Sequence, residues 1–228
     1  MITNEASPPT FLRLLSELER DSLLARGRSK RWQRGDVLVR RGDPADSAIV
    51  VLAGLVKVHA TAVEGAEVVL GFSGPGDLVG ESSAVAGARR LATVSAIDEV
   101  DGVEIAVSHL RAFLTDHPRV MLTLLELALG RLYVSDARRM EFATSESLAR
   151  VAARLIELAE RFGERRDNGA IEILLPITQD ELASWSASSR ESTGRSLRTL
   201  RNLGLIETAR RRLIVIDLER LRSHAPRI

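Results

Sequence analysis

The chain has 228 residues, 45% of them hydrophobic and 28% charged, so it can bury a sizeable core in one large or two modest domains. It has no cysteine, which excludes disulfides, cysteine–zinc sites, cysteine-ligated iron–sulfur clusters and cysteine nucleophiles. The net charge is only +1, but the stretch 176–228 holds ten arginines against six acids. A basic end on a slightly acidic body is typical of a regulator with a DNA-binding terminus.

The N-terminus is predicted to be disordered over residues 1–10. It does not read as a signal peptide, because no apolar stretch follows a charged start. The best apolar run, 121–130, contains Glu126 and is too short to span a bilayer. We therefore expect a soluble, cytoplasmic protein with no membrane partner.

The next hundred residues are predicted to form short helices and then an antiparallel roll. Leucines recur at helical spacing between Thr10 and Ser29, and from Lys30 short β-rich runs alternate with glycine turns. The runs are 34–42, 48–52, 54–59, 67–72, 90–97 and 100–107. Short strands at this spacing are typical of a barrel or roll.

A short helix over 109–116 is predicted to lead through Pro118 into a long helix. The apolar residues of this helix repeat every three or four positions, and they are Met121, Leu122, Leu125, Ala128, Leu129 and Leu132. The stripe fits either a packed core helix or the seam of a two-chain coiled coil. We favour the seam, because a dimer suits DNA binding. The segment 143–147 breaks the stripe and is the predicted hinge.

The C-terminal third is predicted to be a winged helix-turn-helix. It contains an amphipathic helix over 148–162, a polar loop over 163–170 and a strand over 171–176. Two short helices follow, 179–186 and a second that opens on Ser189 as its N-cap. A hairpin over 205–216, with arginines at 210–212, forms the wing.

The second of these helices carries a charged exposed face. Arg190, Glu191 and Arg195 lie near this face, while Thr193, Leu197 and Leu200 are expected to pack inward. Arginine can donate two hydrogen bonds to guanine, and glutamate can accept one from cytosine N4. On these residues alone, a solvated charged surface is an equal alternative.

A second group of residues lies between two predicted strands. Gly80 and Glu81 open a short turn, and Arg90 stands just before the next strand. Backbone N–H groups at such a turn and a guanidinium could hold a phosphate, and Glu81 could accept a hydrogen bond from a ribose hydroxyl. Glycine turns and surface arginines are also common without a ligand.

In this order, these parts resemble the bacterial cyclic-AMP receptor protein/Fnr (Crp-Fnr) superfamily of transcription regulators, from about Phe11 onward. The most specific matches are Gly80-Glu81…Arg90-x-Ala92 and Ser189-Arg190-Glu191-x-x-Gly194-Arg195. The resemblance implies an α+β fold in three parts. These are N-terminal helices with a cyclic-nucleotide-binding β-roll (1–117), a long dimerisation helix (118–143) and a winged helix-turn-helix (144–228).

The resemblance also implies the site residues. The ligand-binding residues would be Gly80, Glu81, Ser82, Arg89, Arg90, Leu91, Ser135 and Asp136. Among them, Glu81 would meet the ribose, either Arg89 or Arg90 the cyclic phosphate, and Ser135 and Asp136 the adenine. The DNA-binding residues would be Thr178, Gln179, Ser189, Arg190, Glu191, Arg195 and Arg198. Thr178, Gln179 and Ser189 would contact the phosphate backbone.

Several positions depart from the family pattern. Leu91 stands where a hydroxyl residue usually binds the phosphate, Asp136 replaces a second hydroxyl residue, and Arg139 lies where the seam is normally apolar. Ser186, Ser188 and Ser196 also occupy places in the helix-turn-helix that are more often apolar. Cyclic AMP is therefore the first expected ligand, with another cyclic nucleotide or none as the alternative.

The resulting hypothesis is a homodimeric regulator that binds a palindromic, TGTGA-like operator under cyclic-nucleotide control, with RNA polymerase as a further partner. The alternatives are a nucleotide-sensing module that acts through protein partners and a Crp-like regulator that binds DNA without a nucleotide. Trp32 and Trp185 are expected in the core. The four histidines lack ligand spacing and no catalytic constellation stands out, so neither a metal site nor an enzyme is expected.

Overall fold

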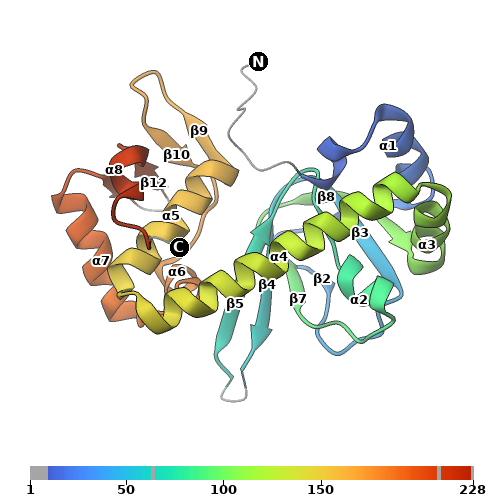
Figure 1. Ribbon diagram of the computed structural model, residues 1–228, viewed down its shortest axis with the longest axis horizontal. Helices are drawn as coiled ribbons and strands as arrows, with labels where there is room; N and C mark the ends of the chain where they lie inside the picture. The colour runs from blue at the N-terminus through green and yellow to red at the C-terminus, as the bar shows by residue number, and fades with distance from the viewer. Residues whose placement is uncertain (1–9, 63–64, 210–211, 227–228) are drawn as a thin grey trace. The chain divides into compact units, whose positions relative to one another are not determined.

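The computed structural model describes residues 10–62, 65–209 and 212–226 (Figure 1). The predicted disorder of residues 1–9 lies outside the described residues. Packing divides the described chain into an N-terminal unit, 10–133, and a C-terminal unit, 134–226. This division falls inside the long helix, whereas the sequence places a boundary on either side of it.

The elements follow one another along the chain as η1 (Phe11–Leu14), α1 (Glu17–Leu24), β1 (Arg28–Trp32), β2 (Val37–Val39), β3 (Ser47–Ala53), β4 (Val56–Thr61), β5 (Glu67–Ser73), β6 (Leu78–Val79), α2 (Glu81–Ala86), β7 (Thr93–Ala96), β8 (Val100–Ala106), α3 (Val107–Asp116), α4 (Pro118–Thr144), α5 (Ser147–Phe162), β9 (Gly163–Arg165), β10 (Ile171–Ile173), α6 (Gln179–Trp185), α7 (Arg190–Asn202), β11 (Ile206–Ala209), β12 (Arg212–Val215) and α8 (Leu218–Arg222).

The N-terminal unit is built on two antiparallel sheets, with strand orders β1-β8-β3-β6 and β2-β7-β4-β5. Alternate side chains of β3 enter two different cores. Ile49 and Val51 pack with Trp32, while Ala48 and Val50 pack with the residues of η1, α3 and α4. Because side chains alternate across a strand, both faces of β3 are covered, and its central residues are all buried. The predicted roll and the α+β class are confirmed.

Two elements of this unit differ from the prediction. The strand β1 begins at Arg28, although helical structure was predicted as far as Ser29. Its first four residues are exposed, so the sequence lacks the apolar alternation that identifies a strand. The short turn predicted at Gly80 and Glu81 continues as a short helix, α2.

An ion pair joins the first helix, α1, to the long helix, α4. Ser16 and Glu19 form a capping box at the start of α1. The same Glu19 carboxylate accepts hydrogen bonds from Arg119 of α4, with 2.9 Å between Nε and Oε1. The bonds from Arg119 and from the Ser16 backbone lower the pKa of Glu19 to about 2.

This lowered pKa predicts a pH-dependent contribution to the free energy of unfolding. The ionised Glu19 stabilises the fold above its ordinary pKa of about 4.5, and the contribution is lost as pH falls towards about 2. We expect Glu19→Gln to lower the midpoint of urea unfolding at pH 7. The difference in midpoint between the variant and the wild type should shrink as pH falls below 4.5. The exposed Glu17 of the same helix supplies the control, Glu17→Gln. An equal difference at pH 7 and at pH 3 would contradict the assignment.

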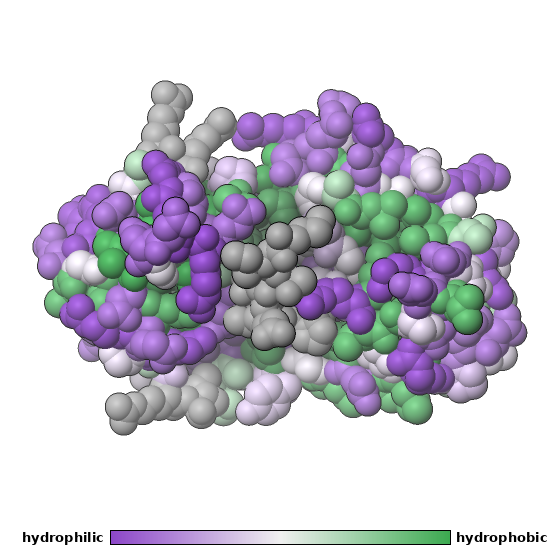
Figure 2. Space-filling model, turned by 90° about the horizontal axis from the view of Figure 1, so that it is seen from above, coloured by the Kyte–Doolittle hydropathy of each residue, from purple (hydrophilic) through white to green (hydrophobic). Residues whose placement is uncertain are grey.

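The long helix α4 presents two kinds of apolar residue. Val120 and Leu124 are buried in the core of the N-terminal unit, as is Thr123 at their side. The predicted seam residues Met121, Leu122, Leu125, Leu129 and Leu132 are instead 49–58% exposed. Hydrophobic residues also reach the surface elsewhere among the hydrophilic ones (Figure 2). These stripe residues are not packed into the core of the N-terminal unit, so the packed-core alternative does not hold for them, and the coiled-coil seam stays a prediction.

The C-terminal unit combines a sheet of order β11-β12-β10-β9 with the helices α5 to α8. The amphipathic α5 buries Val151, Leu155 and Leu158. The prediction of a loop over 163–170 is wrong for its first three residues, because Gly163–Arg165 forms β9, which pairs with β10. A Cβ at Gly163 would lie 2.2 Å from the carbonyl oxygen of Ala159, so glycine permits the direct exit from helix to strand. The predicted winged helix-turn-helix is confirmed, and α8 follows it.

Candidate functional site

The turn at Gly80 connects β6 to α2. Gly80 has φ of +78°, a left-handed conformation that glycine adopts without steric cost. A Cβ at this position would also lie 2.8 Å from Nη1 of Arg90. The left-handed backbone therefore favours glycine, which also leaves room for the Arg90 guanidinium.

Arg90 is buried beneath this turn, and its side chain is only 3% exposed. Its Nη1 donates to the Gly80 carbonyl at 2.8 Å, its Nη2 donates to Ser47 Oγ at 3.3 Å, and Asp46 lies 3.7 Å away. Burial lowers the pKa of Arg90, and nearby carboxylates, Asp46 foremost, oppose that shift. A guanidinium has five N–H donors, so this one retains donors for an anion.

Arg89 has a different environment. Its side chain is exposed and donates to the Gly42 carbonyl at 2.7 Å. The sequence left the phosphate ligand open between Arg89 and Arg90. The geometry favours Arg90, because its guanidinium lies at the Gly80 turn.

Glu81 follows the turn, and it is 4% exposed. Its Oε1 accepts a hydrogen bond from Ser82 Oγ at 3.0 Å and is paired with Arg131 of α4. Arg131 also donates to the Leu78 carbonyl at 3.4 Å. The sequence prediction missed Arg131, which lies fifty positions from Glu81. Its place one turn before Ser135, on the same helix, was the available signal.

The remaining predicted ligand residues do not join this cluster by any described contact. The Leu91 side chain is 74% exposed, and only its backbone N–H bonds to the Ser83 hydroxyl, at 3.4 Å. Ser135 and Asp136 occupy exposed positions of α4 and belong to the C-terminal unit. Asp136 is 3.4 Å from Arg139 in a surface pair. Their proposed role towards adenine remains a prediction.

The helix-turn-helix is assembled by local caps. Thr178 forms a capping box with Glu181 at the start of α6, and Ser189 caps α7 by accepting from the Ser192 N–H. Gln179 Nε2 donates to the Arg190 carbonyl at 3.2 Å. A Cβ at Gly194 would lie 2.7 Å from that amide nitrogen, so Gly194 leaves room for the Gln179 side chain. The predicted cap and both helices are confirmed.

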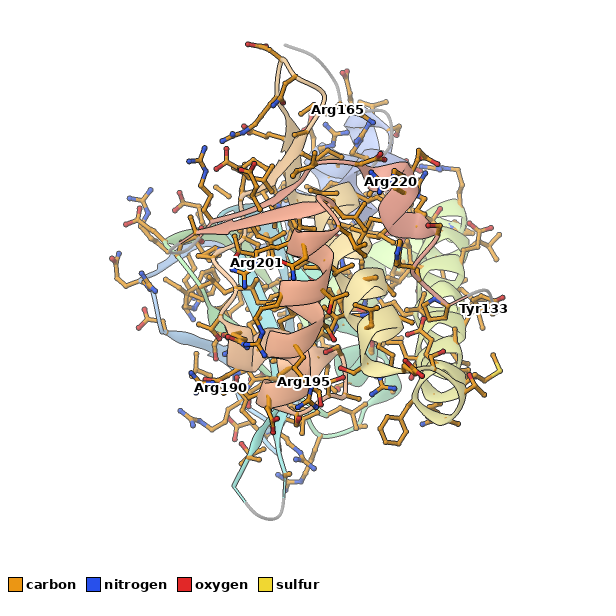
Figure 3. All side chains as sticks on the ribbon, turned by 90° about the vertical axis from the view of Figure 1, so that its left-hand side faces the viewer. Tyr133, Arg165, Arg190, Arg195, Arg201 and Arg220 are labelled. Carbon is orange, nitrogen blue, oxygen red and sulfur yellow. The ribbon has the colours of Figure 1, made fainter. Side chains whose placement is uncertain are left out.

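The predicted base-contacting side chains are exposed. Those of Arg190, Glu191 and Arg195 are 73%, 79% and 56% accessible, and Arg198 is also exposed. Figure 3 shows Arg190 and Arg195 near the N-terminal end of α7 and Arg201 farther along the helix. Arg195 pairs with Glu191, and Arg190 lies 3.2 Å from Asp180. Exposed pairs of this kind contribute little, about 0–1 kcal/mol, so these side chains can turn to another partner.

The inner side of the helix-turn-helix is polar but hydrogen-bonded. Ser186 donates to the Leu182 carbonyl at 2.7 Å, and Ser196 donates to the Ser192 carbonyl at 2.9 Å. Ser147 of α5 donates to Ser188 at 3.0 Å. The serines that depart from the family pattern therefore have hydrogen-bond partners, Ser186 and Ser196 within their own helices and Ser188 with α5. Trp185 is buried beside them, as predicted.

Thr193 is an exception in this polar interior. It is fully buried, and its Oγ1 has no hydrogen-bond partner among the described residues. We expect Thr193→Val to stabilise the C-terminal unit by about 1 kcal/mol, because the replacement removes an unsatisfied hydroxyl. By calorimetry, this is a rise of roughly 2–4 °C in melting temperature. The exposed Thr199 of the same helix gives the control, Thr199→Val, and a lower melting temperature for Thr193→Val would refute the argument.

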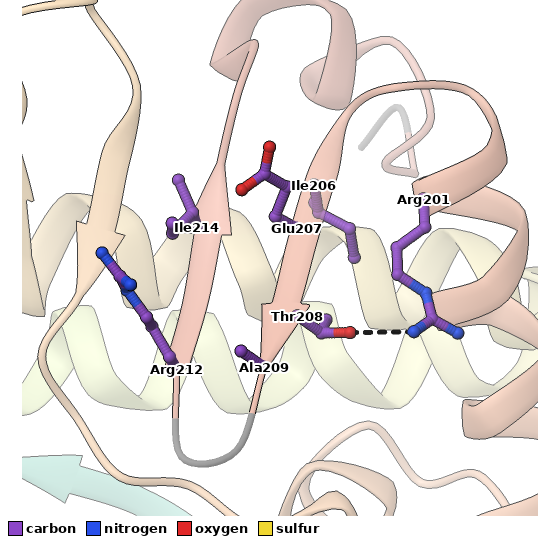
Figure 4. A pocket seen from close by; sticks show the side chains of 7 residues that line it. All are labelled: Arg201, Ile206, Glu207, Thr208, Ala209, Arg212 and Ile214. Carbon is purple, nitrogen blue, oxygen red and sulfur yellow. Dashed lines mark hydrogen bonds between the residues drawn. The ribbon is translucent and has the colours of Figure 1, made fainter.

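The wing contains a cavity of about 330 Å³ beside β11 and β12. Figure 4 shows Arg201 of α7 on one side, with its Nη1 3.0 Å from Thr208 Oγ1. The cavity does not involve the predicted ligand residues. The predicted arginines 210 and 211 lie outside the described residues, whereas Arg212 pairs with Glu172 at 2.7 Å.

Two features are absent from the described residues. No three histidine, aspartate or glutamate side chains gather there in a way that could hold a metal ion. No helix in the described ranges is long and apolar enough to cross a membrane.

Comparison with known proteins identifies both units. Residues 29–117 match the cyclic nucleotide-binding domain, and residues 149–224 match the Crp-like helix-turn-helix domain. A CRP-like cAMP-activated global transcriptional regulator of Mycobacterium tuberculosis is 30% identical over 85% of this chain and 86% of its own. The transcriptional regulator LdrP of Thermus thermophilus is 32% identical over 86% and 96% of the two chains.

A solved structure gives the same result. A CRP-family transcriptional regulator from Thermus thermophilus has a TM-score of 0.71 and 29% identity, covering 86% of this chain and 96% of the other. All these relatives are regulators and not enzymes, which agrees with the lack of a catalytic constellation in the sequence.

Proposed function

The chain belongs to the CRP/FNR family of transcription regulators. From that premise, we propose that it is a homodimer that binds a palindromic, TGTGA-like operator. We further propose that a cyclic nucleotide controls this binding. The exposed face of α7 carries the DNA part of this proposal. Arg190, Glu191 and Arg195 project from its N-terminal half. That end of a recognition helix enters the major groove in helix-turn-helix proteins.

The symmetry of the operator follows from the dimer. Two copies of α7 related by a two-fold axis require half-sites about 34 Å apart, one turn of the DNA. Arg190 and Arg195 would donate to guanines, and Glu191 would accept from a cytosine amino group. Thr178, Gln179, Ser189 and Arg198 would contact phosphates and fix the register. We further propose RNA polymerase as a partner and the cytoplasm as the location, as such a regulator requires.

The exposed leucines of α4 support the dimer. Burial of such a stripe against a second copy stabilises a coiled coil. We expect Leu125→Glu or Leu129→Glu to raise the dimer dissociation constant by at least 100-fold, because two charges would enter the seam. Sedimentation velocity would measure it. The exposed Glu126 gives the control, Glu126→Gln, and a Leu125→Glu variant as dimeric as wild type would exclude this seam.

The nucleotide part of the proposal rests on Arg90 and Glu81. A buried guanidinium beside a glycine turn suits a cyclic phosphate, and a carboxylate next to it suits a ribose hydroxyl. Cyclic AMP is the first candidate, because the relative from Mycobacterium tuberculosis is cAMP-activated by its description. Arg131 would have to release Glu81 or share it with the ribose.

A specific observation favours a second candidate, a regulator that binds DNA without a nucleotide. Both charged groups of the site already have protein partners, since Glu81 pairs with Arg131 and Arg90 bonds to Gly80 and Ser47. Leu91 also offers no hydroxyl. A module that acts only through protein partners is less well supported, because the serines that depart from the family pattern of the helix-turn-helix are hydrogen-bonded within it.

One titration tests these possibilities together. The protein would be titrated by fluorescence anisotropy against a TGTGA-N6-TCACA duplex and a scrambled duplex, with cyclic AMP, cyclic GMP or no nucleotide, at several salt concentrations. Sequence-preferring binding that tightens with cyclic AMP supports the proposal. Equal affinity with and without nucleotide supports the second candidate. The absence of any sequence preference would contradict both DNA-binding candidates and leave the hypothesis of a module that acts through protein partners.

A further inference from the structure

The apolar stripe of α4 continues, at the same spacing, onto two residues of opposite charge. Four leucines of this stripe are separated by three, four and three positions, and they are Leu122, Leu125, Leu129 and Leu132. The next steps of four and three fall on Asp136 and Arg139, and α4 continues through both. Alternating steps of three and four keep side chains on the face that meets a partner helix. Both charged residues therefore lie on the predicted seam.

The other charged residues in this part of α4 are bonded to α5. Arg138 donates to both carboxylate oxygens of Glu157, at 2.8 and 2.9 Å. Glu141 accepts a hydrogen bond at 2.7 Å from Arg154, which is buried. At 3.6 residues a turn, positions 136 and 139 lie on the opposite side of the helix from positions 138 and 141. One charged side of α4 thus faces α5, and the other faces away from it.

The Asp136 and Arg139 side chains form an ion pair with each other and, among the described residues, with no other group. Nη1 of Arg139 lies 3.4 Å from Oδ1 of Asp136, three positions earlier on the same helix. The two side chains are 56% and 81% exposed. An exposed pair of this kind contributes little to stability, so both groups are available to another partner.

A second copy of the chain offers the complementary charges. In a parallel two-stranded seam, each seam residue packs into a hole formed by residues of the facing helix. Side chains lean towards the N-terminal end of their helix, so Arg139 reaches back towards the level of Asp136, about 4.5 Å away along the axis. Two-fold symmetry then gathers two carboxylates and two guanidinium groups with no net charge. Either kind of group alone would face a like charge.

We propose that Arg139 of each chain bonds to Asp136 of a second copy, and that these two crossed ion pairs set the register of the α4 seam. The inference rests on the dimer of the proposed function. A slip of seven residues would place the charged groups of each chain against Leu129 and Leu132 of the other, and an unpaired charge on apolar surface is costly. The leucines then supply stability, while the charged residues select the alignment. The predicted contact of Asp136 with adenine would have to share this carboxylate.

Charge reversal distinguishes a bond between chains from the pair within one helix. Asp136→Arg leaves four guanidinium groups at the seam of a homodimer, and Arg139→Asp leaves four carboxylates. Each variant alone should raise the dimer dissociation constant at least about tenfold, because like charges that face each other oppose association. An equal mixture of the two variants should associate within about threefold of wild type. Neither variant keeps an opposite charge within its own pair, so this recovery arises only between chains.

Sedimentation velocity of each variant and of the mixture, at matched total chain concentration, would measure these constants. The exposed Glu126 of α4 lies outside the spacing of the stripe. Glu126→Arg therefore gives the matched control, with the same change of charge as Asp136→Arg, and it should dimerise like wild type. Circular dichroism would establish that the variants are folded. The advantage of the mixture over either variant should shrink in 1 M salt, where charges are screened beyond about 3 Å.

Three results would overturn the inference while leaving the dimer intact. The first is a dimer as stable as wild type in both reversal variants. The second is a mixture that associates no more tightly than either variant by itself, and the third is an advantage of the mixture that salt does not reduce. A wild-type protein that remains monomeric would instead contradict the proposed dimer, and the crossed ion pairs with it.

Discussion

Replacing Arg190 by alanine is expected to remove discrimination at one base pair of the operator while leaving general DNA affinity largely intact. A bidentate arginine–guanine contact contributes about 1–3 kcal/mol of discrimination against the wrong base. Arg190 is 73% exposed at the start of α7, and its only described ion pair, to Asp180 at 3.2 Å, is between exposed groups. Anisotropy titrations with the operator and with duplexes substituted at each guanine in turn would measure the effect.

The matched control is Arg198→Ala, on the same helix and likewise exposed. As a proposed phosphate contact, Arg198 should contribute equally on every sequence. Its loss should weaken all duplexes alike and reduce the slope of log affinity against log salt by about 1. If Arg190→Ala behaves like Arg198→Ala, Arg190 contacts the backbone and the base-contacting role is wrong. If neither variant changes binding, α7 does not enter the groove.

Arg90→Ala is expected to weaken cyclic AMP binding by roughly two to three orders of magnitude. The reason is that loss of a charge-assisted partner from a buried site costs about 2–5 kcal/mol. The Arg90 side chain is 3% exposed and lies at the Gly80 turn, where the phosphate is proposed to bind. Isothermal titration calorimetry with cyclic AMP would measure the loss. Circular dichroism would establish that the variant is folded, because Arg90 also bonds Ser47.

Arg89→Ala is the control, with the same change of charge one residue earlier. Arg89 is exposed and bonded to Gly42, so this variant should bind cyclic AMP within about threefold of wild type. A large loss in Arg89→Ala, with Arg90→Ala unchanged, would transfer the phosphate role to Arg89. Wild-type protein that binds neither cyclic AMP nor cyclic GMP would instead support regulation without a nucleotide.

The parts of the fold that depend on local chemistry were predictable. Ser189 caps α7 because its hydroxyl bonds an amide three residues on, and such a cap is visible in the sequence. The glycine turns likewise marked the strands of the roll. By contrast, β1 has four exposed residues and no alternation, and it is a strand because β8 pairs with it. A strand that forms because a partner seventy residues away pairs with it need not show any periodic pattern of apolar residues in its own sequence.

The same limit applied to the site. The turn at Gly80 and the nearby arginines were recognisable, but the choice between Arg89 and Arg90 depended on which guanidinium is buried. The ion pair of Glu81 with Arg131 joins two elements that are distant in sequence. The serines of the helix-turn-helix appeared to weaken its core, because composition does not reveal which carbonyls their hydroxyls reach. Side-chain partners across the fold were therefore the missing information.

In the proposed dimer, the leucines left exposed along α4 would also set how the protein responds to its own abundance. Below the dissociation constant of the seam, most chains are monomers, and the dimer concentration rises with the square of the chain concentration. Occupancy of a two-fold operator then rises about fourfold when synthesis doubles. Above that constant, most chains are dimers, and operator occupancy rises in proportion to the chain concentration. Substitutions at Leu125 or Leu129 would thus alter the dose at which genes respond, without changing the DNA sequence that is recognised.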